Sequence, residues 1–211
     1  MEKLKKIIPL IVPPLGVLAV MLIVFKASGM YPFGEGSVSW CDMNQQVVPL
    51  LMDLKDVLDG KSSLFLNLNN AGGMNFYGVF FFFLASPFSF LVKFVDKGDM
   101  FTFVNILVIL KLMTAAFTSA VYFRVCRKEL DPGFAAALSL IYAFCGYGML
   151  FYQNLIWLDM MYLFPLLMIS LDVLVHKSNN IPYIIMVTLT MAVNYYISYM
   201  TVIFIILFIA V

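Results

Sequence analysis

The sequence predicts an all-α integral membrane protein, a polytopic helix bundle. Two features of its composition predict this fold class: of 211 residues, 63% are hydrophobic and only 12% are charged, whereas soluble domains contain about 25% charged residues. The third observation is that the apolar residues form long runs of the length that a helix needs to cross a bilayer. We therefore expect residues 1–211 to form a single transmembrane domain.

Six apolar runs are the predicted spans. A helix crosses the hydrocarbon core with about 20 apolar residues, because its backbone donors and acceptors are then satisfied within the segment. The predicted spans are Ile7–Phe25, Phe101–Phe123, Phe134–Tyr152, Leu155–Val175, Pro182–Tyr195 and Tyr199–Val211. The last run stops within "TVIFIILFIAV" without a polar flank, so we interpret the chain as the N-terminal portion of a longer protein.

Basic residues in the short flanks predict the orientation of these spans. Lysine and arginine are concentrated in the cytoplasmic loops of membrane proteins. The basic flanks here are Lys3–Lys6, Arg124–Lys128 and His176–Lys177. We expect all three flanks, and the N-terminus, on the cytoplasmic side. The long segment Lys26–Met100 is then an extracytoplasmic loop.

The aromatic-rich run Phe76–Val95 is long enough to cross the membrane but conflicts with this alternation. A complete crossing would place the Arg124–Lys128 cluster outside the cell. Pro87 interrupts the run, and aromatic residues are enriched at membrane interfaces. We therefore expect a hairpin or an interfacial helix. The alternative is an ordinary span that overrides the preference for internal positive charge.

The extracytoplasmic loop contains a predicted amphipathic helix. Apolar residues recur at helical spacing within Val47–Leu58, opposite a set of charged residues that includes Asp53. Pro49 suits the first turn of this helix, and Gly60 suits its C-terminal cap. We expect the helix to lie along the outer membrane surface with its apolar side toward lipid.

Two polar stretches of the loop contain candidate binding residues. In "SVSWCDMNQQVVPLL", Asp42 precedes the predicted helix, so its side chain could cap that helix or act in a site. The stretch "NLNNAGGMNFYG" combines amides, which can bind sugar hydroxyls or phosphate oxygens, with glycines, which let a ligand approach the backbone. Such a stretch is also typical of a simple turn.

Three charged residues fall inside the predicted spans: Lys111, Asp159 and Asp172, the last at the cytoplasmic end beside His176. Lys111 lies in the middle of Phe101–Phe123, where an ionisable group is costly unless it is paired or lines a cavity. It therefore has a function or forms an ion pair with an acid on a neighbouring helix. Asp159 follows Trp157 at the start of Leu155–Val175, where it could reach an aqueous pocket shared with Asp42 or favour the helix dipole.

Several functional classes are disfavoured by the composition. The net charge is +1 and the basic residues are scattered, so nucleic-acid binding is not expected. The sequence contains no phosphate-binding loop and no dinucleotide fingerprint. With one histidine, it predicts no metal site. Asp42 with Asp159 could coordinate a divalent cation, although two carboxylates alone are a poor site.

Six stretches between Trp40 and Met200 occur in the order typical of a known family. They are "DMNQQVVPLLMDLKDVLDG", "NNAGGMNFYG", "LASPFSFL", "ILKLMTAAFTS", "NLIWLDMMYLFPLL" and "NYYISYM". Together they resemble the N-terminal part of the YfhO family of bacterial multi-pass membrane proteins, which is similar to GT-C glycosyltransferases. The resemblance implies a GT-C-like bundle in the bacterial cell membrane. It also implies transfer of a sugar from a polyprenyl-phosphate-linked donor to a cell-envelope acceptor, such as lipoteichoic acid, on the outer face.

The resemblance also assigns roles to residues. It implies that Asp42 and Asp159 are the catalytic acids, with donor, acceptor and membrane lipids as the partners. The expected substrate-binding residues are Trp40, Asn44, Gln45, Gln46, Asn70, Gly73, Asn75, Lys111, Trp157, Tyr195 and Tyr196. The alternative functions are a transporter or flippase of a polyprenyl-linked lipid and a non-catalytic scaffold for envelope assembly. A cavity lined by both carboxylates would favour the transferase.

Overall fold

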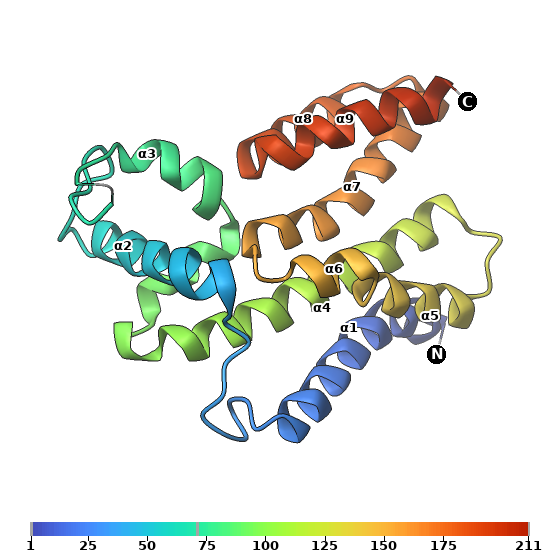
Figure 1. The fold of residues 1–211 in the computed structure, drawn as a ribbon. Helices are drawn as coiled ribbons and strands as arrows, with labels where there is room; N and C mark the ends of the chain where they lie inside the picture. The colour runs from blue at the N-terminus through green and yellow to red at the C-terminus, as the bar shows by residue number, and fades with distance from the viewer. Residues whose placement is uncertain (1, 71, 211) are drawn as a thin grey trace.

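The fold is all-α, as predicted. The computed structural model describes residues 2–70 and 72–210, and within these ranges it contains helices, loops and isolated β-bridges but no strand. The α-helices are α1 (Glu2–Ala27), α2 (Val48–Leu58), α3 (Phe76–Val79), α4 (Met100–Cys126), α5 (Pro132–Ala143), α6 (Gly146–Phe151), α7 (Leu155–Lys177), α8 (Ile181–Val193) and α9 (Tyr195–Ala210). Figure 1 shows their arrangement.

Four segments are long and apolar enough to cross a membrane. They are Ile7–Ala27, Lys97–Cys126, Pro132–Phe151 and Leu155–Lys177, while α8 and α9 are apolar but shorter. In the most apolar 18-residue stretch of each span, 56% of the residues are buried for α4 and for α7, against 11% for α1. The centre of the bundle is therefore the α4–α7 pair, and α1 presents most of its surface outward.

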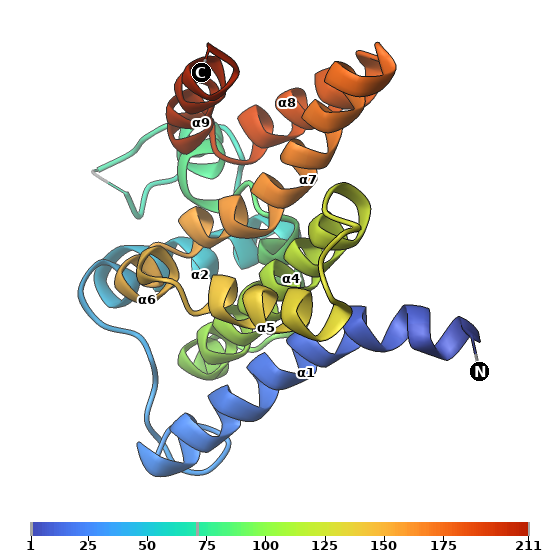
Figure 2. The ribbon, with the colours of Figure 1, turned by 90° about the vertical axis from the view of Figure 1, so that its right-hand side faces the viewer.

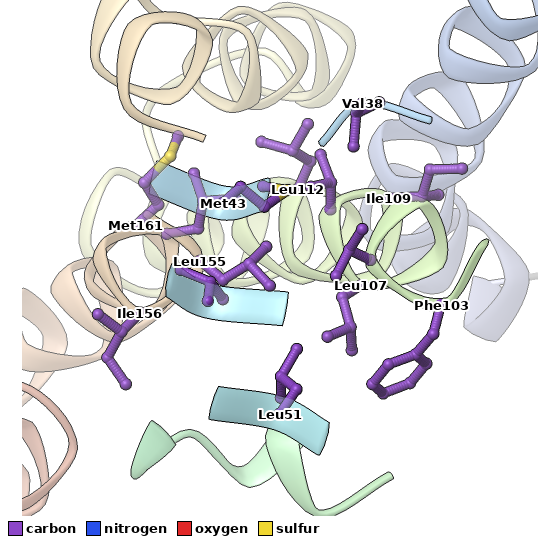
Figure 3. Close-up of a cluster of buried hydrophobic side chains, with 14 of the residues drawn as sticks. Val38, Met43, Leu51, Phe103, Leu107, Ile109, Leu112, Leu155, Ile156 and Met161 are labelled. Atoms are coloured by element: carbon purple, nitrogen blue, oxygen red, sulfur yellow. The ribbon is translucent and has the colours of Figure 1, made fainter. Parts of the chain in front are cut away.

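The hydrophobic core forms where α4 meets α7 and the segment leading into α2. Figure 3 shows Leu107 and Leu112 of α4 gathered with Met43, Leu51 and Leu155, all of them buried. This core joins the loop to the spans, so the loop is packed against the bundle.

The loop helices and the basic flanks lie at opposite ends of the bundle. In Figure 1, α2 and α3 lie at the left with the starts of α4 and α7, whereas the start of α1 and the α4–α5 connection lie at the right. Arg127 and His176, from two of the basic flanks, line one cavity. These two flanks therefore share an end of the bundle, as the alternation of spans predicted.

The aromatic-rich run forms two short helical segments at a sharp angle. Phe76–Leu84 and Pro87–Phe94 are bent by 109° relative to each other. Ser86 occupies the break in an extended conformation, and its hydroxyl accepts a hydrogen bond from the amide of Phe88. We call Phe76–Phe94 the bent segment, since it does not cross as one straight helix.

Helix α2 begins and ends as predicted, but its apolar side does not face lipid. Proline lies in its first turn, and Gly60 follows its end with a φ of +72°, a conformation that glycine adopts without strain. Leu50, Leu51 and Leu54 are buried by α4 and the bent segment. The expectation of a lipid-facing side is therefore corrected, because the bent segment folds back and covers it.

Candidate functional site

A buried ion pair joins the two central helices. The Nζ of Lys111 on α4 lies 2.8 Å from the Oδ2 of Asp159 on α7, and the two side chains are 1% and 0% exposed. The same ammonium donates to the carbonyl of Leu155 at 2.8 Å. An unpaired charge at this depth would be strongly destabilising, so each residue requires the other.

Ser86 connects this ion pair to the bent segment. Its hydroxyl donates to the Oδ1 of Asp159 at 2.9 Å and accepts from Lys111 at 3.1 Å. All three ammonium donors of Lys111 are therefore used, and both carboxylate oxygens of Asp159 have partners. We call Ser86, Lys111 and Asp159 the buried triad. It fixes the break of the bent segment against α4 and α7.

The buried triad provides the partner that one of the two interpretations of Lys111 requires. The structure contains the ion pair with an acid on a neighbouring helix. Asp159 does not reach an aqueous pocket with Asp42, because its carboxylate is fully enclosed whereas Asp42 is exposed. The expected meeting of the two carboxylates is thus absent, since Lys111 requires a counter-charge within the low-dielectric bundle.

Asp42 has an exposed carboxylate that does not cap a helix. It directly precedes a short π-helix, Met43–Val47, and its side chain makes no capping hydrogen bond. The capping interpretation is therefore wrong. Cys41, the preceding residue, has a φ of +45°, which costs a non-glycine residue about 1–2 kcal/mol. Backbone strain of this kind clusters at functional sites.

The π-helix also determines where the neighbouring amides point. Met43 and Val47 are buried, which leaves Asn44, Gln45 and Gln46 exposed on the opposite side. Three amide side chains thus extend into solvent beside the free carboxylate of Asp42. Amides offer both donors and acceptors, so this surface can bind hydroxyl groups.

Aromatic side chains connect the neighbourhood of Asp42 to the starts of α7 and α9. Exposed Trp40 lies beside Tyr152 at the end of α6. The preceding Phe151 packs on Trp157 with ring centroids 5.3 Å apart, and Trp157 stacks on Tyr196 at 6.4 Å. These five residues form what we call the aromatic row. Such rings can stack on sugar faces or lie at the membrane interface.

The other expected binding residues have different positions. Tyr195 is about half exposed and packs edge-on against Phe82 of the bent segment, at 5.8 Å. The side-chain carbonyl of Asn75 accepts from the amide of Tyr77, which caps α3. Gly73 has a φ of +121°, which a side chain would strain, and Asn70 donates to Asp53. The asparagine and glycine residues therefore shape the loop.

Asp53 was not identified from the sequence as a site residue. The residue is 8% exposed, and its carboxylate accepts hydrogen bonds from Asn69 at 2.9 Å and from Asn70 at 2.8 Å. We call these contacts the loop clasp. The expectation that Asp53 lies opposite the apolar side of the helix is therefore corrected: it is buried three residues after Leu50 and one before Leu54, because the two amides of the loop fold over it.

Removal of the loop clasp should loosen residues 64–75 without unfolding the bundle. We expect Asp53→Ala to leave two amides without partners and to cost about 1–3 kcal/mol locally. Amide hydrogen exchange in the full-length protein should then be faster in this loop. Asp56→Ala is the matched control, because Asp56 forms an exposed pair with Lys97 that is worth little. Equal exchange in the two variants would contradict the role of Asp53.

The positions of Asp42 and Asp159 bear on the expectation that these two carboxylates could coordinate a divalent cation. In residues 2–70 and 72–210, no three histidine, cysteine, aspartate or glutamate side chains are close enough to hold a metal ion. Asp159 is already bound by Lys111 and Ser86, so it cannot join Asp42 as a ligand.

The comparisons with known proteins agree with the membrane fold. A family model described as "Bacterial membrane protein YfhO" matches residues 15–211. No curated protein and no solved structure matches the chain significantly. Because the family match covers nearly the whole sequence, the chain belongs to the YfhO family of bacterial membrane proteins.

Proposed function

We propose that the protein is a GT-C-like glycosyltransferase that acts at the end of the bundle carrying α2 and α3. It transfers a sugar from a polyprenyl-phosphate-linked donor to a cell-envelope acceptor such as lipoteichoic acid. The observation that carries this proposal is the free carboxylate of Asp42, held by a strained backbone beside the aromatic row. We place this end outside the cytoplasm, because the basic flanks occupy the other end.

In the proposed reaction, Asp42 is the general base. Its carboxylate takes the proton from an acceptor hydroxyl while that oxygen attacks the anomeric carbon of the donor sugar. The bond from the anomeric carbon to the phosphate oxygen breaks, and the polyprenyl phosphate leaves with the electron pair. A single displacement inverts the configuration of that carbon. A positioned base contributes roughly 100- to 10,000-fold to such a step.

The other candidate residues bind or position the substrates in this proposal. Asn44, Gln45 and Gln46 orient the acceptor, since they extend beside Asp42. Trp157 and Tyr196 bind the sugar or the lipid chain with their stacked rings. Lys111 has no free donor for the leaving phosphate, so the buried triad is assigned the role of holding the bent segment.

The activity is tested with the full-length protein in lipid vesicles. A polyprenyl-phosphate donor with a radiolabelled sugar is supplied together with purified lipoteichoic acid. We expect label to move to the acceptor and free polyprenyl phosphate to accumulate in equal amount. If the label stays on the donor with each of several sugars, the transferase proposal is wrong.

The bent segment gives a specific reason to test the transporter alternative. Transporters bind substrates at interrupted helices, and Phe76–Leu84 with Pro87–Phe94 is such an interruption, with a bend of 109°. A transporter would move an intact lipid-linked sugar between leaflets without releasing the sugar. The same vesicles, assayed for donor accessibility to an external reagent, distinguish this activity from transfer.

A further inference from the structure

Two adjoining cavities lie between α1 and α5, at the end of the bundle opposite α2 and α3. The helices run alongside each other there (Figures 1 and 2). One cavity, of about 330 Å³, is at the end of α4, and the other, of about 420 Å³, continues along the two helices. Both are lined by Pro9, Pro132 and Ala136, so the two cavities adjoin, and we treat them as two parts of one site.

Small side chains explain why this site is hollow. Pro9, Pro13 and Gly16 recur on one face of α1, at the i, i+4 and i+7 positions. They face Ala136 and Ala137 of α5, which are equally small. Apart from Ile8, Val12 and Leu140, which packs against Gly16, the residues that line the inner part are small, and this part of the site is an apolar groove. The groove runs beside α1, and α1 faces mostly outward, so bilayer lipid has access to the groove.

The mouth of the site has the opposite character. Arg124, Arg127 and Lys128 line it, and all three are exposed. None of them forms an ion pair with a described acidic side chain. The nearby carboxylate of Asp131 accepts hydrogen bonds from the backbone at the start of α5, and Glu129 lines neither cavity. The mouth therefore has positive charge available for an anion.

We infer that this site binds an anionic phospholipid of the bilayer. The phosphate group lies against Arg124, Arg127 and Lys128, and an acyl chain follows the groove from Pro9 toward Gly16. Arginine and lysine bind phosphate through charge-assisted hydrogen bonds, and basic pockets between transmembrane helices select anionic head groups. Only a molecule with an anionic head and a long apolar chain complements both parts of the site.

The test measures lipid binding to the delipidated full-length protein by native mass spectrometry. Phosphatidylglycerol and phosphatidylcholine with identical chains are compared, and glycerol 3-phosphate is the chain-free probe. We expect preferential binding of phosphatidylglycerol. The double variant Arg124→Gln/Lys128→Gln should weaken it by roughly 10- to 30-fold, the effect of two basic charges at a membrane surface. Lys177→Gln is the matched control, since Lys177 is basic but lines neither cavity.

A second substitution tests the groove independently of charge. Ala137→Leu fills the apolar part and should weaken phosphatidylglycerol binding. The control is Ile141→Phe, which also adds volume to an exposed position of α5 but lines neither cavity, so binding should be retained.

Three outcomes would overturn the inference. One is equal retention of the two phospholipids by the wild-type protein. The second is a control variant, Lys177→Gln or Ile141→Phe, that weakens binding as much as the variant it is matched to. The third is glycerol 3-phosphate binding as tightly as the phospholipid. None of these readouts depends on transferase activity.

Discussion

Replacement of Lys111 by methionine is expected to destabilise the protein by about 3–5 kcal/mol, which is the cost of removing one partner of a buried ion pair. Methionine keeps much of the side-chain length but leaves the carboxylate of Asp159 uncompensated in a site that is 0% exposed. Denaturant unfolding of the full-length protein in mixed micelles measures the change. Hydrogen exchange should also rise in the bent segment, because Ser86 loses one of its partners.

A double variant distinguishes the effect of the two charges on stability from the effect of the packing around them. Lys111→Met/Asp159→Leu removes both charges, and replacement of a whole buried pair by apolar residues is often neutral. We therefore expect the double variant to be more stable than Lys111→Met alone. Lys93→Met is the control, because Lys93 is exposed and such surface changes stay within about 0.5 kcal/mol. If Lys111→Met behaves like Lys93→Met, the buried triad does not stabilise the bundle.

The fold class and the long helices could be predicted because they depend on local patterns. Apolar runs located the region of each main span, and proline with glycine indicated the ends of α2. From its depth, Lys111 was expected either to be paired with an acid or to line a cavity. Which alternative holds, and that the partner is Asp159, could not be predicted, because Asp159 is 48 residues away and the contact depends on how α4 meets α7.

Other features of the site depend on tertiary contacts that a sequence pattern does not specify. The Ser86-Pro87 pair indicated a break in the aromatic run, but the hydrogen bonds of Ser86 to the ion pair require the break to fold against two helices. Similarly, Asp42 has the spacing of a helix cap. The structure instead places a π-helix after it and a positive φ before it, which leaves its carboxylate free.

The largest expected effect on activity is that of Asp42→Asn. The amide has nearly the same shape as the carboxylate but cannot take a proton from the acceptor hydroxyl. We expect kcat for sugar transfer to fall roughly 100- to 10,000-fold, the usual contribution of a positioned base. KM for the donor should change little, because an interaction made only in the transition state affects kcat and kcat/KM together.

Two controls accompany Asp42→Asn: an unfolding measurement on the variant itself, and the same substitution at another acid of the loop. The side chain of Asp42 makes no capping hydrogen bond, so the variant should unfold at the same denaturant concentration as the wild type. Asp56→Asn removes another acid of the same loop, whose partner is Lys97, and should retain full activity. If Asp42→Asn transfers sugar at the normal rate, Asp42 is not the base. If it instead raises KM and leaves kcat unchanged, the carboxylate binds a substrate in the ground state and the proton must go to another group.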